Sequence, residues 1–157
     1  MSLSPDLVAA IGHAVEEDGG ARPAMLEALR LVQQAHGWVS DEHLADLADV
    51  VGVTTAELED IATFYSLIFR RPVGERLVLL CDGASCWMNG AERVRAAFRE
   101  RFGIGPGETT ADGFLTLIDI CCVGGCDRAP AAVVGRERTL VGPIDPDDLE
   151  KVVEAAR

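Results

Sequence analysis

Apolar residues in the first seventy positions recur with the period of an α-helix. Met25, Leu29 and Val32 fall at i, i+4 and i+7, which places them on one helix face. Serine, threonine or proline, which favour helix starts, precede the periodic stretches, and glycines follow most of them. Together these signals predict a bundle of four helices, over residues 5–17, 23–36, 41–51 and 55–69.

The pattern changes to short apolar runs typical of β-strands after Arg70-Arg71-Pro72-Val73-Gly74. We place a domain boundary in this stretch, which divides the chain into a helical bundle (1–71) and a second domain (72–157). Beyond the boundary the predicted order is strand, helix, strand, strand, strand, helix, over residues 76–80, 91–101, 114–120, 131–134, 138–141 and from Asp145 onward. This order fits a small mixed sheet with helices packed on it. The predicted fold class is therefore α+β, with a thioredoxin-like arrangement in the second domain.

Four cysteines in two pairs follow two of the predicted strands. Cys81 and Cys86 form a C-x4-C pair after the first strand, and Cys122 and Cys126 form a C-x3-C pair after the second. Loops at the ends of two strands can bring four thiolates together in space. The fifth cysteine, Cys121, extends the alternation of its strand, so its side chain is expected to point away from Cys122 as a buried or supporting thiol.

Four thiolates in such loops suit a [2Fe–2S] cluster, in which each iron is bound tetrahedrally by two protein sulfurs. The negative charge of such a group needs nearby N–H dipoles, and tightly wrapped loops supply them. Gly83, Gly124 and Gly125 allow such loops, because glycine adopts φ > 0 and permits close approach of the backbone. Zinc also takes four cysteines at similar spacings, so the pattern alone leaves a structural zinc site as the alternative.

Composition narrows the functional classes. The formal net charge of −12 argues against nucleic acid or anionic lipid as the main partner. No apolar run reaches the roughly 18 residues of a membrane span, and the N-terminus lacks a signal-peptide pattern. A cytoplasmic protein is therefore expected, and in a reducing compartment its five cysteines are better explained as ligands than as disulfides. The three histidines lie apart without ligand-spaced neighbours, so no catalytic residue is predicted.

The segment Phe64–Phe69 is richer in aromatic residues than the rest of the chain. One interpretation places it in the core of the helical bundle. The other makes part of it a surface that docks on a partner subunit, because exposed aromatic residues mark interfaces. The sequence leaves both interpretations open.

Taken together, these residues resemble a known family, the small thioredoxin-like [2Fe–2S] subunit of NADH:quinone oxidoreductase (respiratory complex I), called NuoE in bacteria. The likeness runs from about Arg22 to the C-terminus. Its markers are Ala62-Thr-Phe-Tyr65, Pro72-x-Gly74, Cys81-x4-Cys86, Gly107-Glu-Thr-Thr-x-Asp-Gly113 and Cys121-Cys-Val-Gly-Gly-Cys-Asp-Arg-Ala-Pro130. The resemblance implies a helical bundle before a thioredoxin-like domain and disfavours zinc. It also implies one [2Fe–2S] cluster, with the ligands Cys81, Cys86, Cys122 and Cys126.

The resemblance also implies a function. In the family, this subunit lies beside a larger flavoprotein subunit of the NuoF type, which binds NADH and FMN, and it stores one electron near the flavin. This chain has no NAD or flavin fingerprint of its own, so it is expected to act within the larger respiratory complex, on the cytoplasmic side of the inner membrane. Equivalent subunits of NAD-dependent formate dehydrogenases and NAD-reducing hydrogenases are alternatives. A free thioredoxin-like ferredoxin is an alternative from another functional class.

Overall fold

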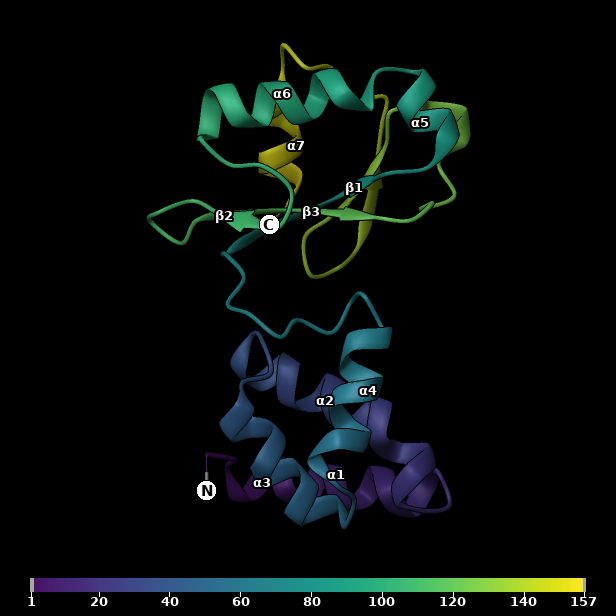
Figure 1. Cartoon of the computed structure of the whole chain (residues 1–157), viewed down its shortest axis with the longest axis vertical. Helices are drawn as coiled ribbons and strands as arrows, with labels where there is room; N and C mark the ends of the chain where they lie inside the picture. Colours follow the sequence, from purple (N-terminus) through teal and green to yellow (C-terminus); the bar gives the residue numbers. More distant parts are fainter. Residues whose placement is uncertain (1, 157) are drawn as a thin grey trace. The chain divides into compact units, whose positions relative to one another are not determined.

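Two compact units make up the chain in a computed structural model that describes residues 2–156. The first unit ends at Pro72 and contains helices α1 to α4, and the second begins at Val73 and contains the sheet (Figure 1). The predicted α+β class, with helices preceding a mixed sheet, is confirmed. Within residues 2–156, no helix combines the length and the apolar composition that crossing a bilayer requires.

The first unit consists of four helices: α1 (Pro5–Glu17), α2 (Ala21–His36), α3 (Asp41–Val51) and α4 (Thr55–Phe64). The side chains of Ser4, Ser40 and Thr54 accept hydrogen bonds from the first turns of α1, α3 and α4, as the capping signals predicted. The helices share one apolar core, whose fully buried members include Ile11, Leu29, Val32, Val39, Leu47 and Leu58. Most of their stability comes from this shared core, because isolated helices of this length are marginal in water.

Helix α4 ends at Phe64, whereas the sequence predicted that it continues to Phe69. The backbone leaves the helical region at Tyr65, with φ −87° and ψ 101°. The side-chain amide of Gln33 then holds the following segment through two hydrogen bonds to its backbone, at 2.9 and 2.6 Å. Ile68 is buried in the bundle core, but Phe64 is 80% exposed and Tyr65 41% exposed. The segment thus divides between the two interpretations that the sequence left open.

His43 closes a capping box at the start of α3. Its Nδ1 accepts the Ser40 N–H at 3.2 Å, and the Ser40 hydroxyl accepts the His43 N–H at 3.0 Å. Partial burial, followed by the neighbouring ring of His36 with its centroid 4.1 Å away, lowers the pKa of His43. Only the neutral ring can accept at Nδ1, so the cap and the pKa shift favour the same protonation state.

A five-stranded sheet in the order β2-β3-β1-β4-β5 organises the second unit. Its strands are β1 (Arg76–Cys81), β2 (Glu108–Thr109), β3 (Leu115–Ile120), β4 (Ala132–Val134) and β5 (Thr139–Val141). The central strand β1 pairs in parallel with β3 and antiparallel with β4. The helical elements are α5 (Ala84–Met88), α6 (Ala91–Phe102), a 3-10 turn (Cys126–Arg128) and α7 (Leu149–Ala155).

Apolar side chains from the sheet and from helices α6 and α7 form the core of the second unit. Val94 and Phe98 of α6 belong to the same buried cluster as Val78 and Leu80 of β1, and Leu149 of α7 joins them. The helical spacing of Val94 and Phe98 predicted this buried face of α6. The core therefore fixes α6 against the central strand.

Helix α7 begins at Leu149, not at Asp145 as the sequence predicted. The carboxylate of Asp145 accepts the Asp147 N–H at 3.0 Å, and its carbonyl accepts the Asp148 N–H at 3.1 Å. Aspartate before proline favours either a helix start or a turn, and here the turn forms first.

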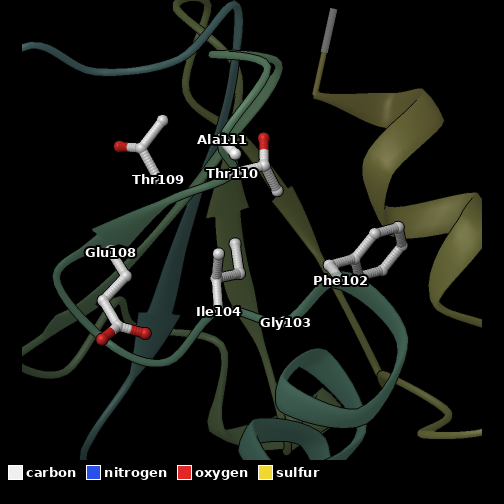
Figure 2. Close-up of a pocket in the computed structure, with 7 residues that line it drawn as sticks. All are labelled: Phe102, Gly103, Ile104, Glu108, Thr109, Thr110 and Ala111. Carbon is white, nitrogen blue, oxygen red and sulfur yellow. The ribbon is translucent and has the colours of Figure 1, made fainter.

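The Gly107–Gly113 motif builds a turn that leads into β3. The Thr110 hydroxyl accepts the Leu115 N–H at 3.0 Å, and the Asp112 carboxylate accepts the Phe114 N–H at 3.0 Å. The short strand β2, which the sequence did not predict, lies within this motif. Figure 2 shows an open pocket beside the turn, lined by Phe102, Gly103, Ile104, Glu108, Thr109, Thr110 and Ala111. The motif thus shapes the sheet edge and contributes no thiol contact among its lining residues.

Thr116 of β3 is polar, yet its side chain is buried, with 3% of the residue exposed. Its hydroxyl accepts the Gly74 N–H at 2.6 Å and shares a hydrogen bond with the Thr109 hydroxyl at 2.7 Å. These two bonds connect β3 both to the segment that enters β1 and to β2.

Candidate functional site

The parallel pairing of β1 and β3 brings the two cysteine loops to one end of the sheet. Cys81 is the last residue of β1 and lies opposite Ile120, the last residue of β3. The Asp82 N–H donates to the Ile120 carbonyl at 2.8 Å, which extends the pairing past the strand ends. Cys122 follows Ile120 after one intervening residue. Because carboxyl ends of parallel strands meet at one edge, the first thiol of each pair starts from the same place.

The second thiol of each pair comes from a short helical element that turns the chain back. Cys86 lies on α5, which follows β1 directly (Figure 1). Cys126 is the first residue of the 3-10 turn. The Cys81 N–H donates to the Ala131 carbonyl at 3.0 Å, which ties the chain beyond Cys126 to the end of β1.

The structure brings the four predicted thiols together. The Sγ atoms of Cys122 and Cys126 lie 4.0 Å apart. The thiol of Cys81 is within interaction range of the thiols of both Cys86 and Cys122. A Cβ atom placed on Gly83 would lie 3.4 Å from the Cys81 Sγ and 3.6 Å from the Cys122 Cβ, so Gly83 separates the two loops.

The two pairs differ in exposure. Cys81 and Cys86 are 2% and 1% exposed, whereas Cys122 and Cys126 lie at the surface. Cys121 is also exposed, so the prediction of a buried thiol there is wrong. The reason is that β3 ends at Ile120, and the alternation of buried and exposed side chains ends with it.

Backbone N–H groups point at the buried thiol of Cys81. The Gly83 N–H donates to the Cys81 Sγ at 3.4 Å. Burial raises the pKa of Cys81, but N–H donors of Val123 and Gly83 and the adjacent thiols outweigh it and leave the pKa lowered. Burial raises the pKa of Cys86, and the neighbouring Cys81 adds to that effect. The donors therefore favour a thiolate at Cys81, the form that binds metal.

Glycine is needed at the second loop for two separate reasons. Gly124 has a φ of +80°, a conformation that other residues rarely adopt. Gly125 is buried, and a Cβ there would lie 3.1 Å from both the Ala131 Cβ and the Leu140 Cδ1. The loop that ends at Cys126 is thus wrapped closely on the sheet.

The chemistry of this donor set fits an iron–sulfur cluster. Two sulfurs bound to one tetrahedral metal ion at ~2.3 Å lie roughly 3.8 Å apart, close to the Cys122–Cys126 separation of 4.0 Å. Within residues 2–156, no group of three or more His, Cys, Asp or Glu side chains is arranged to hold a single metal ion. The thiols fit the pairwise arrangement of two ligands per iron.

Two features beside the thiols were not predicted. Helix α5 exposes Trp87 (61%) and Met88 (77%) directly after Cys86. Arg95 of α6, which the sequence placed on a charged outer face, has a side chain only 11% exposed and bonds to Asp82 and Asp119. The aromatic residue next to a cysteine was a visible signal for the first feature. No local signal existed for the second, because its partners come from other elements.

The fold and the four clustered thiols define a thioredoxin-like iron–sulfur protein. The sequence model of the thioredoxin-like [2Fe-2S] ferredoxin family matches residues 11–157. The chain belongs to this family, which confirms the resemblance drawn from its motifs, and its cofactor is a [2Fe–2S] cluster.

Named relatives agree with this assignment, and two of them are NuoE subunits of NADH-quinone oxidoreductase. The chain is 40% identical over 153 residues to the NuoE subunit of Pseudomonas aeruginosa, covering 98% of this chain and 91% of the relative. It is 41% identical over 128 residues to the NuoE subunit of Escherichia coli, covering 82% and 77%.

Among solved structures, the chain is similar to an NAD+-reducing [NiFe]-hydrogenase in the H2-reduced state, with a TM-score of 0.69 and 27% identity. The match covers 85% of this chain but only 22% of the hydrogenase chain, so this chain spans about a fifth of that protein's length.

Proposed function

We propose that this protein is the electron-transfer subunit of an NADH:quinone oxidoreductase complex, in which Cys81, Cys86, Cys122 and Cys126 hold the [2Fe–2S] cluster. The observation that carries this proposal is the meeting of these four thiols at the ends of β1 and β3. The identity of about 40% to NuoE relatives over most of the chain supports it.

When bound, the cluster accepts and releases one electron at a time. The chain's own residues create the conditions for this. The Gly83 N–H, donating to the Cys81 Sγ, offsets negative charge on the sulfur. Burial of Cys81 and Cys86 keeps water from that side of the site, while Cys122 and Cys126 face the surface. Electrons therefore have a short route to a partner on the exposed side.

The proposed partner is a flavoprotein subunit of the NuoF type that binds FMN and NADH, with both subunits on the cytoplasmic side of the membrane. The exposed side chains of Trp87 and Met88 follow Cys86 directly and offer an apolar surface beside the thiols. Aromatic residues and methionine are enriched at the cores of such interfaces. Phe64 and Tyr65 provide a second exposed aromatic surface, in the helical unit. No catalytic residue is assigned to this chain, and hydride transfer belongs to the partner.

We propose a division of labour between two domains, with the boundary at residues 71–72. The second domain carries the thiols. The helical bundle has its own apolar core and contributes no ligand, so its role is attachment to the complex. Expressing residues 72–157 alone should give a protein that still binds iron and sulfide but fails to co-purify with the flavoprotein.

A related assembly is the second candidate. The structural similarity to an NAD+-reducing [NiFe]-hydrogenase favours the same module serving a hydrogenase or a formate dehydrogenase. Genes for membrane proton-pumping subunits beside this one would support the respiratory complex, and a nickel or molybdenum enzyme would support the alternative. A free ferredoxin is the third candidate. It predicts a monomer that exchanges electrons with several enzymes, whereas stable co-purification with one flavoprotein argues against it.

Single Cys→Ser variants test the ligand set. Replacing Cys81, Cys86, Cys122 or Cys126 should remove or strongly alter the cluster, measured by iron and sulfide content and by electron paramagnetic resonance of the reduced protein. Cys121→Ser is the matched control and should retain the cluster. Loss of the visible absorption in the Cys121 variant, with retention in the Cys122 variant, would overturn the assignment.

A further inference from the structure

Arg95 connects the two segments that carry the thiols. It lies on α6, and its Nε is 3.0 Å from both carboxylate oxygens of Asp119. Its Nη2 is 2.8 Å from the Asp82 Oδ1. Asp82 follows Cys81 directly, and Asp119 lies in β3 shortly before Cys122. One guanidinium group therefore bonds to the base of each cysteine loop.

The surroundings hold this side chain in place. Nη1 of Arg95 is 2.7 Å from the Glu92 carboxylate on the preceding turn of α6. The Arg95 side chain is only 11% exposed, whereas those of Asp82 and Glu92 are 60% and 64% exposed. An arginine fork reaches several acceptors in fixed directions, which the single ammonium of lysine cannot reproduce. Removing Arg95 would leave three carboxylates without their shared cation.

We propose, on the basis of the function proposed above, that Arg95 is a positioning residue for the [2Fe–2S] site. It fixes the spacing between the Cys81–Cys86 loop and the Cys122–Cys126 loop. It also supplies positive charge beside a group that gains an electron. Positive charge near a redox centre stabilises the reduced form, so Arg95 raises the reduction potential as well as retaining the cluster.

Four variants of the full chain separate these two effects. Arg95→Gln removes both the fork and the charge, and Arg95→Lys keeps the charge alone. Asp119→Asn keeps Arg95 but weakens its bond to β3. The control is Arg101→Gln, which removes an arginine from the same helix whose exposed bond to Glu150, at 2.6 Å, lies away from the cysteine loops.

Two readouts are measured on each purified protein: the rate at which a chelator bleaches the visible absorption, and the midpoint potential followed by electron paramagnetic resonance. We expect the Gln, Lys and Asn variants to bleach several-fold faster than Arg101→Gln. We expect the potential to fall in Arg95→Gln, to rise in Asp119→Asn, and to stay near wild type in Arg95→Lys. A purely structural role for Arg95 would not produce potential shifts of opposite sign.

Bleaching rates and potentials equal to those of Arg101→Gln in all three variants would overturn the role of Arg95 while leaving the ligand assignment intact. If Arg95→Gln does not fold, the Lys and Asn variants decide by the same criteria. A wild-type chain that binds no iron or sulfide would overturn the proposed function, and the role of Arg95 with it.

Discussion

Replacing Gly83 by valine tests whether the two cysteine loops meet. Gly83 has φ −71° and ψ 153°, which other residues adopt freely, so the effect of a side chain here is steric. A Cβ at this position would lie 3.4 Å from the Cys81 Sγ, 3.6 Å from the Cys122 Cβ and 3.7 Å from the Cys122 Cα. These are ordinary contact distances, so Gly83→Ala should keep the cluster.

Valine adds methyl groups about 1.5 Å beyond the Cβ atom. A methyl group directed at the Cys122 loop would come within roughly 2 Å of it, well inside the contact distance of about 3.5–4.0 Å between carbon atoms. Overpacking of this kind costs about 1–3 kcal/mol. Because about 1.4 kcal/mol is a factor of ten, the population with closed loops should fall by roughly 5- to 150-fold.

The assay is cluster content after reconstitution, followed by the rate of bleaching with a chelator. Ala84→Val is the matched control, because it introduces the same side chain at the next position, which is exposed. The expected order of cluster retention is wild type and Gly83→Ala first, Ala84→Val close to them, and Gly83→Val far below. Equal retention by Gly83→Val and Ala84→Val would refute the placement of the Cys122 loop against Gly83.

Three further predictions concern stability. Thr116→Val keeps the shape of the side chain but leaves the Gly74 N–H without its acceptor, so urea unfolding of the second unit should show a loss of about 1–3 kcal/mol, with Thr116→Ser losing less. Phe98→Ala should cost about 3–5 kcal/mol in the same measurement, because it empties a fully buried aromatic position. The lowered pKa of His43 means that the unfolded chain takes up the proton first. Stability of the helical unit should therefore be fully present above the ordinary pKa of 6.5 and should fall as the pH drops below it. His43→Gln keeps an acceptor for the Ser40 N–H without titrating, and a pH dependence unchanged in this variant would contradict the assignment.

Local signals predicted most of the elements correctly. The capping residues Ser4, Ser40 and Thr54 placed three helix starts, because a cap involves only residues within one turn. The apolar runs placed β1 and β3 within one residue of their observed bounds. Two strands that each precede a cysteine pair were enough to predict that the thiols converge, since the strand ends carry the loops with them.

Features that depend on distant partners were missed. Helix α5 has only five residues, too few for a periodic pattern, and it forms between Cys81 and Cys86 where the loop folds back. Arg95 was assigned to an outer face because helix periodicity reports only the packing side of its own helix. Its carboxylate partners come from Asp82 and Asp119, and only the assembled sheet brings them to it. The exposure of Cys121 likewise depended on where β3 ends.

The central position of β1 determines when the site can first exist during synthesis. β1 is made before either of its neighbours, and β4 is complete only when Val134 has been added. Until then, the strand that ends at Cys81 has an open edge, and no nascent chain shorter than this can present all four sulfurs on a closed sheet. Iron and sulfide must therefore be delivered to a nearly finished polypeptide, and ribosomes stalled before that point would release chains unable to retain them.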